Sequence, residues 1–360
     1  MVVQNFSRSY VEARAKFLDA ARARGMRIVS ARLPDRLGPE GEALTMDTAI
    51  YAPKGAESMF VVTSGVHGPE GFCGSGCQVG MLNDDELFGV LAEKKCALLL
   101  VHAVNPFGFA HLRRVNEDNV DLNRNAVDHA AARELNPAYE EVERLLLPHS
   151  WPPTPEAEEA LEAYASKHGE RAVRAIAAAG QYRVADGMFF GGNSVSWSTR
   201  ELRSIFLEHA SAYRRVALVD IHTGLGPFGH AEKIFLSKSK DELQRAHSWW
   251  GADVRWMYEP GCVSTETSGS ALFSVYDLPS HVEKTTLGIE YGTYEEGRVF
   301  SALRGDHWLH KHPECGAEQN AQIKQAMKDA FYPDTDEWKG AVYGQIRVIA
   351  LQAVSGLTRQ

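Results

Sequence analysis

Two residues that can bind a metal ion, His67 and Glu70, stand three positions apart in the glycine-rich segment SGVHGPEGFCGSG (64–76). The segment follows the apolar run MFVVT (59–63), and a strand that ends in such a turn places polar side chains at the carboxyl edge of a sheet. A spacing of three brings an imidazole and a carboxylate within reach of one cation. The pair would supply two of the three protein ligands of a catalytic zinc site. The alternative is a histidine that caps a helix or is hydrogen-bonded within the turn.

A third ligand is available in the segment RVALVDIHTGLG (215–226), where His222 ends an apolar run and precedes a glycine-containing loop. This is the same topological position as that of His67, so two histidines and a glutamate would meet at one sheet edge. His102 lies inside an apolar run and is expected in the core or beside the site. His230, in a loop, is a weaker candidate. Three late histidines are expected on a solvated surface: His307, His310 and His312.

An unusual density of arginine and asparagine follows in NPFGFAHLRRVNEDNVDLNRN (105–125). The N-P-x-G sequence predicts a turn after a strand. Arginine with asparagine in such a loop suits bidentate binding of a carboxylate. The alternative is a solvated, charged face.

The order of these motifs resembles that of the zinc carboxypeptidase family: H-x-x-E, then N-P-x-G with R-x-N-x-x-x-V-D-L-N-R-N, then a strand-terminal histidine, then a glutamate in LGIEYGTY (287–294). The motifs span residues 67–290, about two-thirds of the chain, and their joint order is more specific than any one of them. Within the family, the chain is most similar to a bacterial branch of unknown function close to succinylglutamate desuccinylase and aspartoacylase.

The resemblance implies a role for each matching residue. One Zn²⁺ per chain would be bound by His67, Glu70 and His222, with Asp121 hydrogen-bonded to the first zinc histidine. Arg114 would polarise the scissile carbonyl, and Glu290 would be the general base. Asn123 and Arg124 would hold a substrate carboxylate.

The chemistry implied is hydrolysis of an amide bond next to a free carboxylate, in a short peptide or in an N-acyl amino acid. Zinc lowers the pKa of bound water towards ~7, and a nearby glutamate can then accept its proton. The family's substrate-closing tyrosine has no clear counterpart, although Tyr258, Tyr291 and Tyr294 are available. Two alternatives stay open: a catalytically silent carboxylate- or amide-binding protein on the same fold, and a metal-independent hydrolase that uses a Ser or Cys nucleophile.

The elements that must position these residues alternate between strand-like and helical patterns. Six apolar runs predict strands: 27–33, 59–65, 96–105, 215–222, 233–237 and 286–292. Continuous apolar runs indicate strands buried on both faces. We therefore expect an α/β fold with a central mixed, largely parallel sheet and helices on both faces, in one domain over 1–360. The proline-led, helical texture of 126–200 predicts an insertion within that domain, able to narrow the substrate site. Two helices broken at Pro333 should end the chain, with Asp334 or Asp336 as N-cap.

The composition excludes several classes of function. A formal net charge of −9 without a basic stripe argues against binding nucleic acid. The longest apolar run is about half of the ~20 residues that a membrane-spanning helix needs, and the N-terminal 25 residues read as an amphipathic helix rather than a signal peptide. Five cysteines form an odd set that suits a reducing compartment, so we expect a cytoplasmic protein. Cys73 and Cys77 are expected in the core of a helix. A homo-oligomer is compatible with the sequence.

Overall fold

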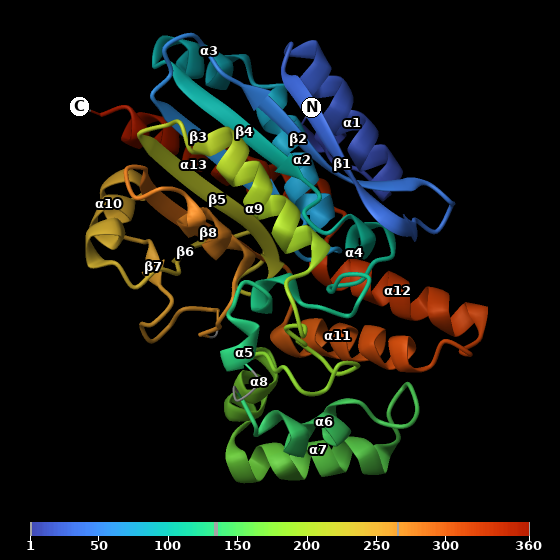
Figure 1. Cartoon of the computed structure of the whole chain (residues 1–360). Coiled ribbons are helices and arrows are strands. Elements are labelled where there is room, and N and C mark those ends of the chain that lie inside the picture. Colours follow the sequence, from blue (N-terminus) through green and yellow to red (C-terminus); the bar gives the residue numbers. More distant parts are fainter. Residues whose placement is uncertain (1, 133–135, 265, 360) are drawn as a thin grey trace.

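The computed structural model describes residues 2–132, 136–264 and 266–359, and it contains one central sheet with helices on both faces (Figure 1). The strands lie in the order β1-β2-β4-β3-β5-β8-β6-β7. The four central strands, β4, β3, β5 and β8, are parallel, whereas β2 and β6 flank them antiparallel. The predicted mixed, largely parallel α/β sheet is therefore confirmed. The strands are β1 Arg27–Leu37, β2 Ala43–Tyr51, β3 Ser58–Ser64, β4 Cys96–His102, β5 Arg215–Gly224, β6 Ala231–Phe235, β7 Arg255–Trp256 and β8 Glu283–Gly292.

All six predicted strands form. Strands β3 and β4 are buried at every position, as expected for central strands that are covered on both faces. Two strands were missed. Strand β7 has only two residues, and the sequence of β2, ALTMDTAIY, mixes threonine and aspartate with its apolar residues. Its Asp47 is fully buried because Arg14 Nε donates to it at 2.7 Å.

Two hydrophobic layers cover the sheet. On one face, α1, α2 and α13 pack in a cluster that includes Phe17, Phe72 and Ile346. On the other face, α9 and η3 contribute Phe206 and Leu272 to a second cluster. The helices before residue 126 are η1 Val2–Asn5, α1 Tyr10–Ala23, α2 Gly71–Leu82, α3 Asp85–Glu93, α4 Pro106–Ala110 and η2 Leu122–Arg124. Those after residue 196 are α9 Trp197–Ala210, α10 Lys240–Trp250, η3 Ala271–Asp277, α11 Glu296–Lys311, α12 Ala317–Phe331 and α13 Asp336–Leu357.

The 126–200 segment projects from one end of the sheet, at the lower end of the view in Figure 1. Its helices are α5 His129–Ala132, α6 Tyr139–Leu146, α7 Pro155–His168 and α8 Glu170–Ala178. Residues of α6 pack against α11 and α12 in a third hydrophobic cluster, which includes Tyr139, Leu303 and Met327. The segment thus has its own apolar contacts with the late helices. Its description as an insertion within a single domain stays a prediction.

The C-terminal helices and two of the cysteines agree with the sequence-based predictions, except for one N-cap. Helices α12 and α13 are separated around Pro333, but the N-cap prediction was wrong: Thr335 caps α13, since its side chain accepts from the N–H of Trp338. Cys73 and Cys77 are buried in α2, as predicted.

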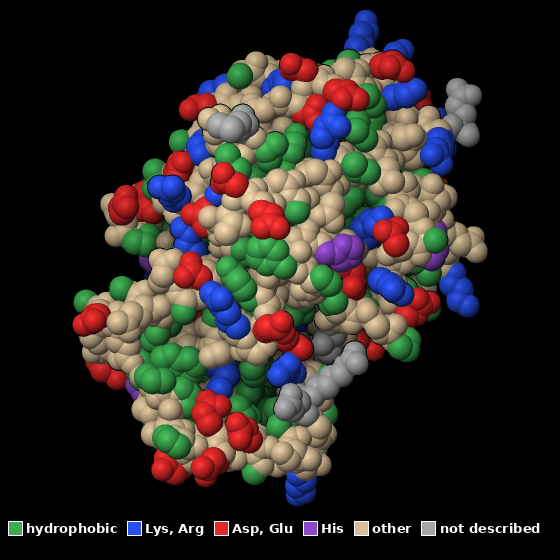
Figure 2. Space-filling view, turned by 180° about the vertical axis from the view of Figure 1, so that it is seen from behind, with side chains coloured by type: hydrophobic (Ala, Val, Ile, Leu, Met, Phe, Trp, Pro, Cys, Tyr) green, Lys and Arg blue, Asp and Glu red, His purple; other side chains and the backbone are tan. Residues whose placement is uncertain are grey.

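Acidic and basic side chains are interspersed over the face shown in Figure 2. Within the described ranges, no helix combines the length and the apolar character needed to cross a bilayer.

Candidate metal centre

The two sequence motifs that contain histidine meet at the carboxyl edge of the parallel strands. His67 lies in the turn after β3, Glu70 immediately precedes α2, and His222 lies near the end of β5. The turn is tight because Gly68 lies against the 108–114 loop: a Cβ there would be 2.0 Å from the carbonyl carbon of Gly108. Any larger residue at position 68 would push the His67 turn away from the loop that contains Arg114.

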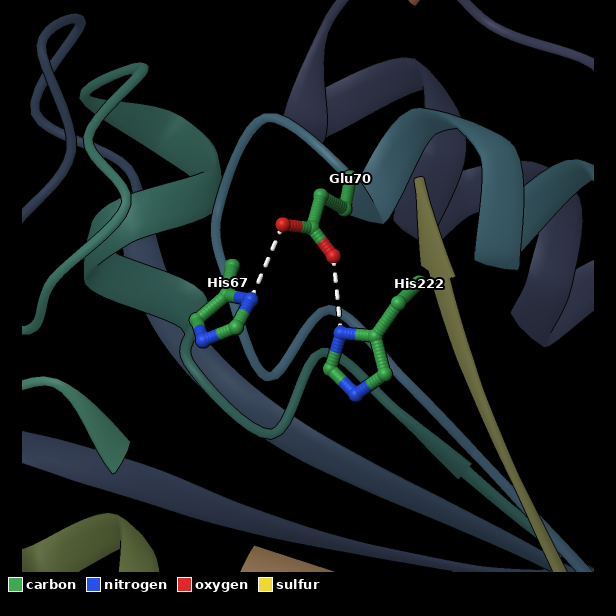
Figure 3. Close-up of side chains that lie close together, drawn as sticks. All are labelled: His67, Glu70 and His222. Atoms are coloured by element: carbon green, nitrogen blue, oxygen red, sulfur yellow. Dashed lines mark hydrogen bonds and ion pairs between the residues drawn. The ribbon is translucent and has the colours of Figure 1, made fainter. Parts of the chain in front are cut away.

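The predicted ligands lie together and point toward one another (Figure 3). Oε1 of Glu70 is 2.9 Å from Nδ1 of His67, and its Oε2 is 2.8 Å from Nδ1 of His222. One ligand atom from each residue lies within 4.8 Å of the others, and the three side chains are almost entirely buried. Two imidazole nitrogens and a carboxylate oxygen at this spacing are the donor set of a catalytic zinc site, in which a fourth position is left for water.

The second nitrogen of each ring faces an aspartate. Nε2 of His67 is 3.2 Å from Oδ1 of Asp121, as the resemblance implied, and Nε2 of His222 is 2.8 Å from Oδ2 of Asp220. Asp220 also accepts a 2.6 Å hydrogen bond from the hydroxyl of Thr63. A carboxylate on the outer nitrogen fixes the tautomer and orientation of a metal-binding histidine. Asp220 was not among the residues predicted from the sequence, although the D-x-H spacing places both side chains on the same side of β5.

The charges of this group offset one another. Burial alone would raise the pKa of Glu70, yet His67 and His222 hold it well below its usual range. Burial likewise opposes ionisation of Asp121, whose pKa Arg114 and Arg124 nonetheless hold well below its usual range. Ionised carboxylates buried this deeply require positive charge beside them, and a divalent cation between Glu70 and the imidazoles would provide it. The residues present therefore fit a zinc ion.

Arg114 lies beside the candidate ligands, whereas its neighbour Arg113 points elsewhere. Nε of Arg114 donates to Oδ2 of Asp121 at 3.0 Å, and its Nη1 is 3.5 Å from Oε1 of Glu70. Its guanidinium also lies over the ring of Phe189, 5.2 Å from the centroid. Arg113 instead pairs with the buried Asp306 of α11 at 3.2 Å. Of this arginine pair, Arg114 therefore faces the cavity and Arg113 ties the loop to α11.

Glu290 lines the same cavity from β8, where it is the register partner of His222 on β5. It is not part of the candidate ligand group. Its Oε1 accepts the N–H of Leu225 at 3.0 Å. Burial, with the nearby charge of Glu70, raises the pKa of Glu290 to about 7. This carboxyl can accordingly take up and release a proton near neutral pH.

Asn123 and Arg124 are held firmly by the backbone around them. The side-chain oxygen of Asn123 accepts from the N–H of Ala271 at 2.9 Å, and its Nδ2 lies 3.4 Å from Nε2 of His222. Arg124 donates from Nε and Nη2 to the carbonyl of Ala178, and from Nη1 to its neighbour's carbonyl. Both residues line the cavity. The predicted substrate-binding pair thus lies beside the candidate ligands, and some of its side-chain hydrogen-bonding groups are already bonded to the backbone.

The cavity, together with the open solvent at its mouth, comprises about 1140 Å³ of empty space. Its apolar wall comes from β6, β8, η3 and the loops next to them, and includes Ile234, Leu236, Val263, Leu272 and Gly288. A second wall combines the 126–200 segment with α11 and includes Arg174, Ala178, Phe189, Glu296, Val299 and Phe300. Arg174 Nη1 pairs with Glu296 at 2.8 Å across this wall. The site is therefore a pocket with one hydrophobic side and one mixed side.

The other histidines and the candidate tyrosines lie elsewhere. His102 is fully buried, with Nε2 2.9 Å from the hydroxyl of Ser75, as expected for a core histidine. His230 is exposed and does not line the cavity. The surface prediction was wrong for His307, which is buried against the Arg113–Asp306 pair because α11 packs there. Of the tyrosines, Tyr291 is buried in the core, while Tyr294 lines a separate hollow beside the cavity with Phe228.

Comparisons with known proteins extend over most of the chain. Residues 6–345 match the sequence model of a family described as "Protein of unknown function (DUF2817)". No curated protein matches.

Three solved structures are similar in outline. Carboxypeptidase A from Helicoverpa armigera has 12% identity and TM-score 0.43, over 90% of this chain and 74% of that one. Bovine thrombin-activatable fibrinolysis inhibitor, in complex with tick carboxypeptidase inhibitor, has 13% identity and TM-score 0.43, over 91% and 97%. A metallo-carboxypeptidase from Pseudomonas aeruginosa has 15% identity and TM-score 0.35, over 93% and 68%. The closer relation to succinylglutamate desuccinylase and aspartoacylase stays a prediction.

Proposed function

The chain belongs to the DUF2817 protein family, and we propose that it is a zinc-dependent hydrolase that cleaves an amide bond next to a free carboxylate. One observation carries the proposal: a single cavity is lined by the His67–Glu70–His222 group and by three groups outside it. These are Arg114, Arg124 and Glu290. Metal ligands, a proton acceptor and cationic groups in one pocket are the set that metal-assisted amide hydrolysis requires.

Each group has a separate task in this reaction. Zinc, when bound, supplies Lewis-acid chemistry that makes water a nucleophile near neutral pH. Glu290 accepts the proton of the attacking water and passes it to the leaving nitrogen, a role that a pKa of about 7 suits for a reaction near neutral pH. Arg114 stabilises the negative charge that develops on the carbonyl oxygen. Asp121 and Asp220 hold the two imidazoles in the orientation that points Nδ1 at Glu70.

The substrate is expected to be small and to contain a carboxylate. Arg124 binds that carboxylate, with the Asn123 amide beside it. The apolar wall around Leu236 and Leu272 suits a hydrophobic substrate side chain. The 126–200 segment forms the opposite wall through Ala178 and Phe189, which favours short substrates. Short peptides and N-acyl amino acids both meet these requirements, so the enzyme is either a carboxypeptidase or a deacylase.

Metal analysis of the purified protein, followed by a substrate panel, tests the proposal. We expect about one zinc per chain, bound by three protein ligands, and loss of zinc in His67→Ala and His222→Ala. The exposed His230→Ala is the matched control and should keep its zinc. Hydrolysis of short peptides or N-acyl amino acids, measured by mass spectrometry, should stop on chelation.

Three outcomes would overturn the proposal. Zinc retained by both ligand variants would remove the metal site. Activity that survives chelation would indicate a metal-independent hydrolase. Binding of zinc and of carboxylates with no turnover across the panel would indicate a catalytically silent binding protein instead.

A further inference from the structure

The side chain of Arg124 is enclosed by the 126–200 segment. Arg124 is only 4% exposed, and the residues that enclose it are Ala178, Gly180, Tyr182, Phe189 and Gly191. They come from the end of α8 and the loop that follows it, which are separate in sequence from the strands that position the candidate metal ligands. The segment therefore contacts a residue of the proposed substrate site directly.

The hydrogen bonds of the Arg124 guanidinium define its orientation. Nε donates to the carbonyl of Ala178 at 3.1 Å, Nη2 donates to the same carbonyl, and Nη1 donates to the carbonyl of Asn123 at 2.8 Å. Ala178 is the last residue of α8, where carbonyls lack a partner within the helix and the helix dipole favours a cation. A guanidinium has five N–H groups, so the three in these bonds leave two, one on each Nη atom. Phe189 packs 5.7 Å from the guanidinium carbon.

Two further contacts fix the rest of the residue. The hydroxyl of Tyr182 donates to the backbone carbonyl of Arg124 at 2.6 Å. Gly180 lies so close to the aliphatic part of the side chain that a Cβ there would be 2.5 Å from Cδ of Arg124. Gly180 also has a φ of +90°. The arginine is thus held at its backbone, its stem and its guanidinium by one segment.

We propose that Ala178, Gly180 and Tyr182 are positioning residues for substrate binding, which aim the two remaining Nη N–H groups of Arg124 at the carboxylate of the substrate. This inference rests on the proposed function and deepens it. The 126–200 segment then contributes to recognition, and not only to the size of the pocket. A side chain held before binding loses less conformational freedom when the carboxylate arrives.

Gly180→Ala tests the positioning, with Gly169→Ala as its matched control. Gly169 lies in the same segment with a φ of +91°, but the nearest atom to a Cβ there is the Ala172 Cβ at 3.9 Å. Both variants place an alanine at nearly the same positive φ, and only at Gly180 does the added Cβ meet Arg124. We expect Gly180→Ala to raise KM for the acid substrate about tenfold, with kcat within about twofold. The C-terminal amide of that substrate should show no selective loss, and Gly169→Ala should leave both KM values unchanged.

The substrate pairs are benzoyl-glycyl-phenylalanine with its carboxamide, and N-acetyl-phenylalanine with its carboxamide. Calorimetric binding of both acids and both amides to Glu290→Gln, with and without Gly180→Ala, gives the same comparison without turnover. Tyr182→Phe should raise the KM for the acid substrates by about two- to threefold. Tyr164→Phe, on α7 and away from Arg124, should leave that KM unchanged. Thermal unfolding of all variants verifies that they fold.

Arg124→Ala separates the two possible failures. If Arg124→Ala weakens the acids selectively while Gly180→Ala behaves like Gly169→Ala, the positioning inference is wrong and the proposed function stands. If Arg124→Ala affects acids and amides equally, the carboxylate role of Arg124 fails, and the positioning inference fails with it. Selective loss of acid binding in both Arg124→Ala and Gly180→Ala supports the inference.

Discussion

Nε2 of His222 lies 2.8 Å from Oδ2 of Asp220, two residues earlier on β5, while Nδ1 of the same ring lies 2.8 Å from Glu70. His67 has the same arrangement, with Asp121 on one nitrogen and Glu70 on the other. Each imidazole is therefore held between two carboxylates. One of these is shared, and it lies where a metal would bind.

Asp220→Asn should weaken zinc binding by about 10- to 100-fold, because the amide no longer fixes the His222 tautomer or raises the basicity of the ring. Competition with a chelator at fixed pH measures the affinity. Asp253→Asn, which changes an exposed aspartate paired with Lys233 outside the cavity, should bind zinc as the parent does. Equal affinity in Asp220→Asn and the parent would show that Asp220 does not orient the ligand.

Glu290→Gln should bind zinc normally and lose hydrolysis by about 10²- to 10⁴-fold, because an amide cannot accept the proton of water. Single-turnover kinetics on the best substrate of the panel, together with metal analysis, measure both properties. Glu232→Gln is the matched control: Glu232 is the register partner of Glu290 on β6 but does not line the cavity. Undiminished hydrolysis by Glu290→Gln would assign the base elsewhere.

Gly288→Val should narrow the apolar side of the pocket. A Cβ at Gly288 would already lie 3.1 Å from the Leu236 side chain, so the extra methyl groups extend into space that a substrate side chain would occupy. We expect kcat/KM for phenylalanine-containing substrates to fall about tenfold relative to the alanine-containing ones. A uniform loss across side chains would place the substrate side chain outside this wall.

Stability should decrease as the pH falls from about 6.5 towards 4. Burial lowers the pKa of His102 to about 4, and burial likewise lowers the pKa of His307 to about 4. Each of these histidines binds a proton more readily when the chain is unfolded, so their stabilisation is complete above pH 6.5 and is lost on acidification. One such group gives a slope of up to about 1.4 kcal/mol per pH unit.

Urea unfolding at several pH values measures this slope. In His102→Asn the slope should be smaller by the amount that corresponds to about one proton fewer taken up on unfolding, whatever the absolute stability of the variant. The exposed His230→Asn should keep the parent slope. An unchanged slope in His102→Asn would mean that His102 takes up its proton equally in both states.

The sequence predicted those parts of the fold and the site that depend on local pattern. Continuous apolar runs indicated six of the strands, and the glycine-rich turn and the strand-terminal histidine placed His67, Glu70 and His222 at one sheet edge. Strand β2 was missed because its burial depends largely on distant partners: the buried Asp47 accepts hydrogen bonds from Arg14 of α1 and Ser30 of β1, as well as from Thr45 on its own strand. His307 was misplaced for the same reason, since the packing of α11 against the Arg113 loop decides its burial.

What the residues alone determined is which groups could do chemistry and at which edge of the sheet they emerge, because strand ends and turns follow from side-chain type and spacing. What only the tertiary structure decided is how those groups are held. The pKa of Glu290 and the contacts of the 126–200 segment with Arg124 depend on groups that are distant in sequence or on burial in the folded chain. Such contacts arise from packing between elements, and no local pattern of the chain specifies them.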